Sequence, residues 1–234
     1  MKTSYFNTEA LKATRNFGGT TKGTAEPYIT GYHFIKVAHA PSMLKNHLSP
    51  NPGNVSGDSD INRILEATCA SVTPPGGTLN KTEFNGLGGT KWSAPTNIDY
   101  GTSLTMRFVE FEYLPVLTVI HSWVKMIRDY RTGVSALVGG ELKKENYAAT
   151  IYYWTTKPDG RTVEYSACYT GVFPTKDPQD LFTGDLTASD KLEMDIDFNV
   201  DWIWHEDWVH NNCQNYSNTR GGSAGVGHRG NIHP

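Results

Sequence analysis

The sequence has few cysteines, few charged residues and no long apolar run, and each shortage excludes a class of protein. The three cysteines among 234 residues, Cys69, Cys168 and Cys213, lie far apart and show no CxxC spacing. We therefore expect three buried thiols, with neither a disulfide framework nor a zinc site. No stretch approaches the roughly 18 apolar residues of a transmembrane helix, and the first residues lack the apolar core of a secretory signal. These two absences predict a chain that is made in a cytoplasm and has no membrane partner.

The net charge of the chain is also small. A formal net charge of -3, with 19% charged residues, gives no general attraction to nucleic acid or to anionic membranes. The Gly- and Thr-rich segment Gly18–Gly23 superficially resembles a phosphate loop, but it lacks the spacing of one and the strand that should precede it. We therefore expect no nucleotide and no other cofactor. A hydrophobic content of 38% indicates a folded globular protein, and 12% aromatic residues favour strands over helices.

The clearest pattern is a two-residue alternation over residues 191–204. Apolar side chains alternate there with the carboxylates Glu193, Asp195, Asp197 and Asp201. Only a β-strand sends alternate side chains to opposite faces, so the pattern predicts one long strand with an apolar face and a wet, acidic face. Repulsion between neighbouring carboxylates requires water or cations on that face.

Further strands and one helix follow from shorter patterns. Strands are expected at residues 28–38, 103–113, 147–155 and 162–169, and a second apolar run covers residues 61–72. The sequence Lys-Pro-Asp-Gly at 157–160 predicts the tight turn of a β-hairpin between the strands that flank it. Pro115 begins an amphipathic helix that ends near Tyr130.

The apolar face of this helix is expected to pack on the sheet through Ile120, Trp123 and Ile127. His121, Ser122 and Asp129 do not form a catalytic triad, since adjacent helical residues such as His121 and Ser122 point about 100° apart. The sequence therefore predicts no enzyme activity.

The remaining segments set the domain limits. Residues 1–26 are an N-terminal arm, residues 27–208 form the folded domain, and residues 209–234 are a tail that is flexible or ordered by a partner. Two long segments rich in Gly, Pro and Asn, 41–58 and 76–100, interrupt the domain. Loops of this length are often functional, and we expect both to mediate contacts between subunits.

The order of these segments resembles the tail-tube protein of contractile-tailed bacteriophages, a family related to the tubes of other contractile injection systems. The resemblance covers roughly residues 28–204 and rests on an ordered set of short pieces. The pieces are Ala67–Gly76, Pro115–Tyr130 with its Trp123, Tyr147–Tyr169, Gly171–Pro174 and Asp195–Trp202.

This resemblance implies a fold and a function. The fold is mainly β (α+β), with two packed sheets closing into a small β-barrel or sandwich and one flanking helix. Six copies form a ring, and rings stack into the inner tube of a virion tail, assembled in the host cytoplasm. The implied partners are further copies of the chain, the tail sheath, the baseplate and the tape-measure protein. Glu193, Asp195, Asp197 and Asp201 then line the lumen, where they repel double-stranded DNA in transit during genome ejection.

Two alternatives remain open at this point. A tube-initiating baseplate protein or a tail terminator would have the same fold, and the number of copies per virion would distinguish them from the repeated subunit. A metal-binding module is the other alternative, because the carboxylates of Asp195 and Asp197 suit Mg²⁺ or Ca²⁺. A monomer that needs metal, rather than a ring, would support that second reading.

Overall fold

Strands are the main regular element in the computed structural model of this protein, which describes residues 32–48, 58–85, 91–129, 131–137, 143–157, 159–178 and 192–220. The strands are β1 (His33–His39), β2 (Cys69–Thr73), β3 (Gly77–Asn85), β4 (Lys91–Tyr100), β5 (Ser103–Val109), β6 (Ala149–Thr156), β7 (Val163–Pro174), β8 (Glu193–Asn199) and β9 (Trp202–Trp204). The helices are α2 (Leu44–His47), α3 (Asp58–Thr68), α4 (Pro115–Ile127), α5 (Lys144–Tyr147) and α6 (Asp207–Arg220).

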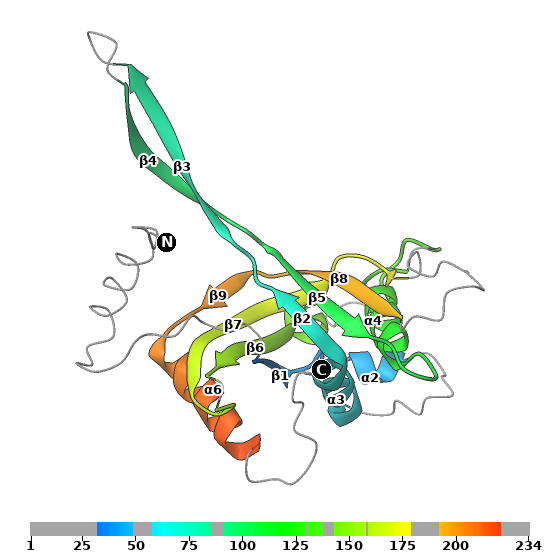
Figure 1. The fold of residues 1–234 in the computed structure, drawn as a ribbon. Coiled ribbons are helices and arrows are strands. Elements are labelled where there is room, and N and C mark those ends of the chain that lie inside the picture. The colour runs from blue at the N-terminus through cyan, green and yellow to red at the C-terminus, as the bar shows by residue number, and fades with distance from the viewer. Residues whose placement is uncertain are drawn as a thin grey trace, which may run out of the picture. The chain divides into compact units, whose positions relative to one another are not determined.

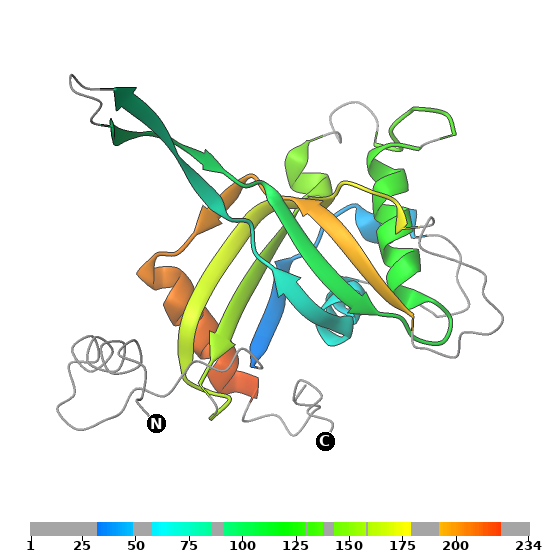
Figure 2. The ribbon, with the colours of Figure 1, turned by 45° about the horizontal axis from the view of Figure 1, so that its top comes forward.

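The strands form two layers that share β7 (Figures 1 and 2). The order across the sheet is β1-β6-β7-β8-β5-β2, with β9 also paired to β7, and all of these pairs are antiparallel. Most of β7 pairs with β6, whereas its last two residues, Phe173 and Pro174, pair with β8. This arrangement confirms the predicted mainly β sandwich.

The sheet does not close into a barrel within the described residues, because its end strands β1 and β2 do not pair with each other. Helix α3 contacts both β1 and β5 at this opening. Its Glu66 carboxylate accepts a hydrogen bond from the backbone N–H of Val37 at 3.0 Å and forms an ion pair with Lys36 at 3.0 Å. The Glu66 side chain thus accepts the hydrogen bond of a backbone N–H on the edge strand β1. Without it, a neighbouring strand would have to supply the acceptor.

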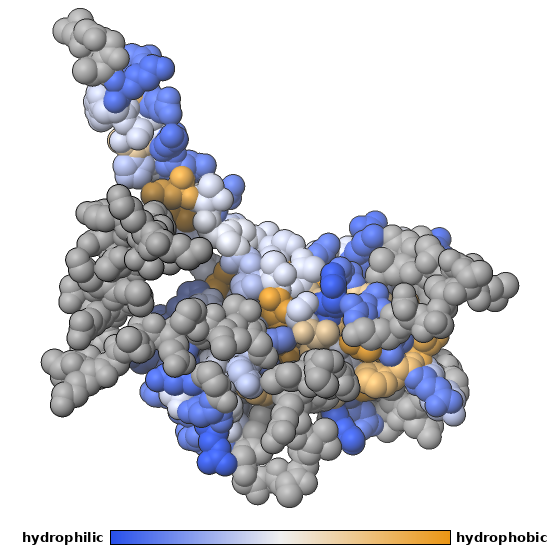
Figure 3. Space-filling model, viewed as in Figure 1, coloured by the Kyte–Doolittle hydropathy of each residue, from blue (hydrophilic) through white to orange (hydrophobic). Residues whose placement is uncertain are grey.

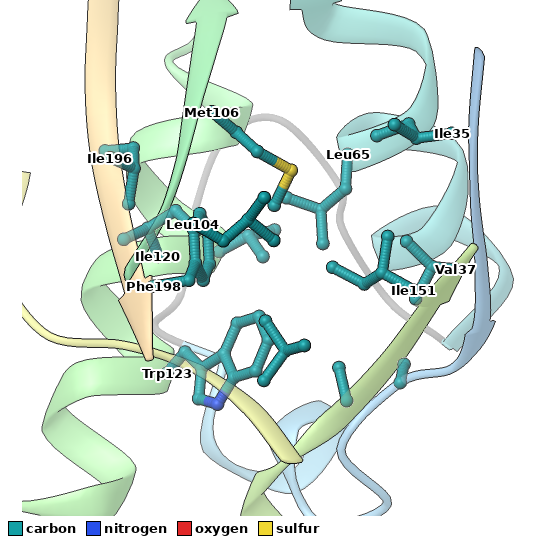
Figure 4. Close-up of a cluster of buried hydrophobic side chains, with 14 of the residues drawn as sticks. Ile35, Val37, Leu65, Leu104, Met106, Ile120, Trp123, Ile151, Ile196 and Phe198 are labelled. Atoms are coloured by element: carbon teal, nitrogen blue, oxygen red, sulfur yellow. The ribbon is translucent and has the colours of Figure 1, made fainter. Parts of the chain in front are cut away.

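The core lies between the two layers and helix α4. Figure 4 shows Ile120 and Trp123 of α4 facing the cluster that also receives Val37 and Ile151 from the opposite layer. Ile120 and Trp123 are fully buried, and Ile127 is half-buried against the same cluster. The Trp123 indole N–H donates to the backbone carbonyl of Tyr147 at 2.6 Å, so this large side chain is buried without an unpaired donor.

The long strand predicted at residues 191–204 is two strands, which is a correction to the alternation argument. Val200 and Asp201 separate β8 from β9, and the backbone N–H of Asp201 bonds to Thr170 of β7 at 3.1 Å. The chain leaves the β5–β8 layer here and joins the opposite layer. Trp202 is consequently 68% exposed, although the alternation placed it on the apolar face.

Gly171 sits in β7 where the partner strand changes. Its φ of +71° is in the left-handed region, and the register with β6 shifts by one residue beside it. A Cβ at this position would overlap the Asp201 side chain, which lies directly against the glycine. Only glycine fits both the backbone angle and this close approach.

Besides the short helices α2 and α5, two longer helices lie where the sequence predicted none. The run 61–72 is mostly α3, with Ile61, Leu65 and Thr68 buried at the i, i+4, i+7 spacing of a helix face. The predicted tail over 209–220 is wrong as well, since α6 packs on β6 and β7. Its buried stripe is narrow, with Val209 and Cys213 as the fully buried apolar members, so its sequence looks like a polar linker.

The two predicted loops also differ from what was expected. Most of 76–100 is the β3–β4 hairpin, in which Gly77 pairs with Tyr100 and Asn85 pairs with Lys91. Within 41–58, helix α2 places Leu44 fully in the core, while residues 49–57 lie outside the described residues. The predicted arm, residues 1–26, lies outside them too.

We predict that Trp123→Ala lowers the free energy of unfolding by about 3–5 kcal/mol, because it leaves a large cavity and an unpaired Tyr147 carbonyl. Urea unfolding of the unassembled chain measures this change. Trp202→Ala is the matched control, since the exposed indole should contribute no more than about 0.5 kcal/mol. Equal effects of the two substitutions would show that the α4 face is assigned incorrectly.

We also predict that Gly171→Ala destabilises the chain more than Gly133→Ala. Both glycines have positive φ, +71° and +67°, so both substitutions carry a backbone strain of about 1–2 kcal/mol. Nothing lies within 4 Å of a Cβ built on Gly133, whereas the one on Gly171 overlaps Asp201. The difference in unfolding free energy therefore isolates the overlap, and its absence would contradict the close approach.

Candidate functional site

Three of the four predicted carboxylates share one sheet face. Asp195 and Asp197 are exposed and Glu193 is half-buried, while the β8 residues between them are buried in the core. The alternation argument therefore holds within β8, and this face is open to water. We call the outward side of β5 and β8 the acidic face.

Strand β5 brings a cation to this face. Arg107 is the cross-strand partner of Asp195, and its guanidinium donates two hydrogen bonds to that carboxylate, at 2.7 and 2.8 Å. The third guanidinium nitrogen of Arg107, Nη1, lies 3.7 Å from the Glu193 carboxylate. The hydrogen bonds from Arg107 lower the pKa of Asp195 below its usual value, so this carboxylate stays charged to lower pH than a free aspartate.

Asp197 is bonded less strongly. Its carboxylate accepts a hydrogen bond from the Thr105 hydroxyl at 2.6 Å, and its backbone carbonyl accepts two from Thr175. The described residues of β5 and β8 therefore set one guanidinium against three carboxylates. The face is still acidic, but less so than the sequence of β8 alone predicted, because the register that pairs Arg107 with Asp195 could not be read from either strand.

Asp201 lies beyond the end of β8 and belongs to a different environment. Its carboxylate rests over Gly171, forms an ion pair with Lys144 of α5, and accepts a hydrogen bond from Asn199 at 3.2 Å. Lys144 also lies 5.1 Å from the centre of the Phe173 ring. Asp201 thus packs against the bulge in β7, and Lys144 neutralises its charge.

The described residues contain no group of three or more His, Cys, Asp and Glu side chains that could hold a metal ion. The Asp195 and Asp197 carboxylates, the pair considered for Mg²⁺ or Ca²⁺, are each bonded to β5 instead. His121 bonds to Asp177 at 2.9 Å, and its neighbour Ser122 is buried. Among the described helices, none has the length and apolar character needed to cross a membrane.

The second candidate surface is the β3–β4 hairpin, whose residues are exposed except for the half-buried Ala94. Figure 1 shows it running outward from the ends of β2 and β5, and Figure 3 shows hydrophobic residues among the hydrophilic ones on its surface. The Phe84 and Trp92 rings stack with centroids 4.3 Å apart, and Leu79 pairs across the ladder with Ile98. The sequence showed these side chains only as isolated apolar residues in a Gly- and Asn-rich segment, so the hairpin was missed.

No protein-family model and no curated protein matches the sequence. Among solved structures, the chain is similar to a sheath/tube terminator of an extracellular contractile injection system (15% identity, TM-score 0.46, covering 78% of this chain and 98% of that one). It is also similar to the tube-terminating cap of an anti-feeding prophage (13%, 0.47, 80% and 95%) and to a sheath-tube complex of an extracellular contractile injection system (14%, 0.44, 77% and 92%). TM-scores below 0.5 do not transfer a function, so the function is argued from the surfaces of this chain.

Proposed function

We propose that this protein is a structural subunit of a virion tail tube, without catalytic activity, in which six copies form a ring and rings stack around a channel. The observation that carries the proposal is the β3–β4 hairpin. A two-stranded hairpin is marginally stable by itself in water, and this one is exposed on both faces. No described residue of the chain buries its five large apolar side chains, so a partner molecule would stabilise them; they are Leu79, Phe84, Trp92, Ile98 and Tyr100.

A further copy of the same chain is the partner that this hairpin fits. An extended ribbon with free edges and apolar side chains is suited to packing along a neighbour's sheet or loops. Every copy in a tube carries one hairpin and one set of receiving surfaces, so each contact repeats around and along the assembly. The six-fold number follows from the resemblance of the sequence to tail-tube proteins.

The acidic face is the surface we assign to the channel. DNA carries about one negative charge per 1.7 Å of its length, so a wall with excess carboxylates repels it and gives it no binding site. The bond between Arg107 and Asp195 keeps these side chains from extending freely toward the channel axis. The tail sheath, the baseplate and the tape-measure protein are the expected neighbours of such a tube, and double-stranded DNA passes through it during genome ejection.

The first test is the assembled state of the purified chain. Negative-stain electron microscopy should show six-fold rings and tubes built from many stacked rings. Single rings, with few copies per virion, would identify a tube initiator or a terminator of the same assembly. A chain that stays monomeric at every concentration would contradict the proposal. A monomer that depends on added Mg²⁺ or Ca²⁺ would also contradict it and would favour the metal-binding alternative.

We predict that Asp197→Lys slows genome release, because a cation at this position is repeated in every copy and can pair with DNA phosphates. Asp197 is chosen over Asp195 because it is bonded to a neutral hydroxyl, so its replacement leaves no unpaired guanidinium. Asp197→Asn is the matched control and should release DNA as the wild type does. The measurement is DNA ejection at equal particle number, and unchanged ejection from the lysine variant would exclude the channel assignment.

A further inference from the structure

A second exposed apolar surface lies at the other end of β5 from the hairpin. Phe111 and Tyr113 are both 57% exposed and Leu114 is 38% exposed, in the short connection from β5 to α4. We call residues 111–114 the α4 corner. Its only charged side chain is Glu112, which is also exposed.

The corner holds its apolar side chains outward at an energetic cost. Tyr113 and Leu114 both have positive φ, 71° and 52°, which bulky residues rarely adopt. The buried Glu110 carboxylate holds this geometry, since it accepts hydrogen bonds from the backbone N–H groups of Phe111, Val116 and Leu117 at 2.8–3.1 Å. This turn satisfies N–H groups at the start of α4, but it leaves three apolar side chains exposed, which gives no stabilisation within the described residues. Observed strain of this kind points to a function.

The hairpin and the corner are arranged for a head-to-tail contact. Strand β5 begins just after the hairpin, at Ser103, and ends just before the corner, at Val109. Figures 1 and 2 both show the hairpin leaving one end of this strand and the α4 corner following the other end. A second copy shifted along the direction of β5 therefore brings its corner toward the hairpin of the first, and this contact repeats without closing.

The charges of the two surfaces agree with this pairing. The outer half of the described hairpin carries Lys81 and Lys91 against a single carboxylate, Glu83, which pairs with Lys81 at 3.1 Å. Lys91 is therefore available to form an ion pair with Glu112, the acidic residue of the α4 corner. Opposite charges around an apolar centre set the orientation and the partner more than they set the affinity.

Building on the proposed function, we infer that the outer half of the β3–β4 hairpin of one copy packs on the α4 corner of a copy in the next ring, and that this contact gives the stack its direction. Phe84 and Trp92 meet Phe111, Tyr113 and Leu114 across it. We expect one such contact, made by a few side chains from each copy, to bury less than the roughly 1,200 Å² of a stable interface and not to pair two free monomers. Six of them between two rings act together, because the first contact fixes the others at high effective concentration.

The test compares exposed-residue variants that leave the monomer core untouched. Trp92→Thr keeps a strand-forming residue in β4, and Tyr113→Asn keeps a residue that tolerates positive φ. Each should leave rings intact in electron microscopy and shorten tubes at least ten-fold at equal protein concentration. Trp202→Thr, the same change at an exposed tryptophan on β9, is the control and should give tubes of wild-type length.

The outcomes separate this inference from the proposed function. Loss of rings in Trp92→Thr would mean that the hairpin contacts a neighbouring copy within the same ring. That result would overturn the inference but would not contradict the proposed tube. Equal shortening by Trp202→Thr would overturn it too, because any exposed tryptophan would then matter. A wild-type chain that forms no rings at all contradicts the proposed function itself.

Cysteine pairs give a direct readout of the contact. Cys168 and Cys213 are buried and Cys69 is half-buried, and burial raises the pKa of the three thiols, to about 12 for Cys69, about 11 for Cys168 and about 12 for Cys213, so they stay protonated at neutral pH. The double variant Lys91→Cys with Glu112→Cys keeps the apolar side chains of the contact, and it should form a ladder of covalent multimers when its tubes are oxidised, because each copy links to one above and one below. Each single variant should stay monomeric on a non-reducing gel. Tubes that form without a ladder, or single variants that cross-link equally, would overturn the inference.

Discussion

The fold depends on the point where β7 passes from one layer to the other. A single strand can pair with β6 over most of its length and then with β8 only if its backbone bends sharply, and Gly171 supplies the left-handed residue that permits the bend. Asp201 closes over the missing side chain and bonds to Lys144. The same junction breaks the β8–β9 path, because Asp201 bonds to β7 and turns the chain toward the opposite layer.

From this junction the two layers enclose one core, and α4 and α3 cover the sides that the strands leave open. Helix α6 then covers the outer side of β6, which is why β6 is buried on both faces apart from Thr150 and reads as a nearly continuous run of large residues. Polar groups contribute to this packing as well. Gln214 of α6 accepts a hydrogen bond from the backbone N–H of Val163 and donates one to the carbonyl of Arg161.

The surfaces that remain are of two kinds, and their physical properties differ. The acidic face is wet, rigidly paired and unsuited to adhesion, because its most central carboxylate is held by Arg107. The hairpin and the α4 corner are apolar and exposed; the hairpin is held by its cross-strand ladder and the corner by the Glu110 carboxylate. The proposed stacked, hollow assembly rests on these two kinds of surface, one acidic and two apolar, which lie along the same strand.

The sequence by itself determined the elements whose pattern is local. The alternation in β5 and β8, the Pro115 helix with its buried Ile120 and Trp123, and the turn at Gly160 all follow from side-chain period and backbone preference, which neighbouring residues set. The acidic residues of β8 were likewise found from alternation alone. For the candidate site, the sequence pattern therefore identified the carboxylates. It identified neither their bonding partners nor the apolar contact surfaces.

Only the tertiary structure decided what depends on residues far apart in the chain. The pairing of Arg107 with Asp195 needs the register between β5 and β8, and the break after Asn199 needs the presence of β7. Helix α6 was missed because its narrow stripe looks polar until β6 and β7 provide a surface for it. The hairpin was missed because its cross-strand pairs, such as Phe84 with Trp92, are eight residues apart and carry no periodic signal. Contacts between residues far apart in the chain stabilise each of these features. A pattern of neighbouring residues carries no information about such contacts.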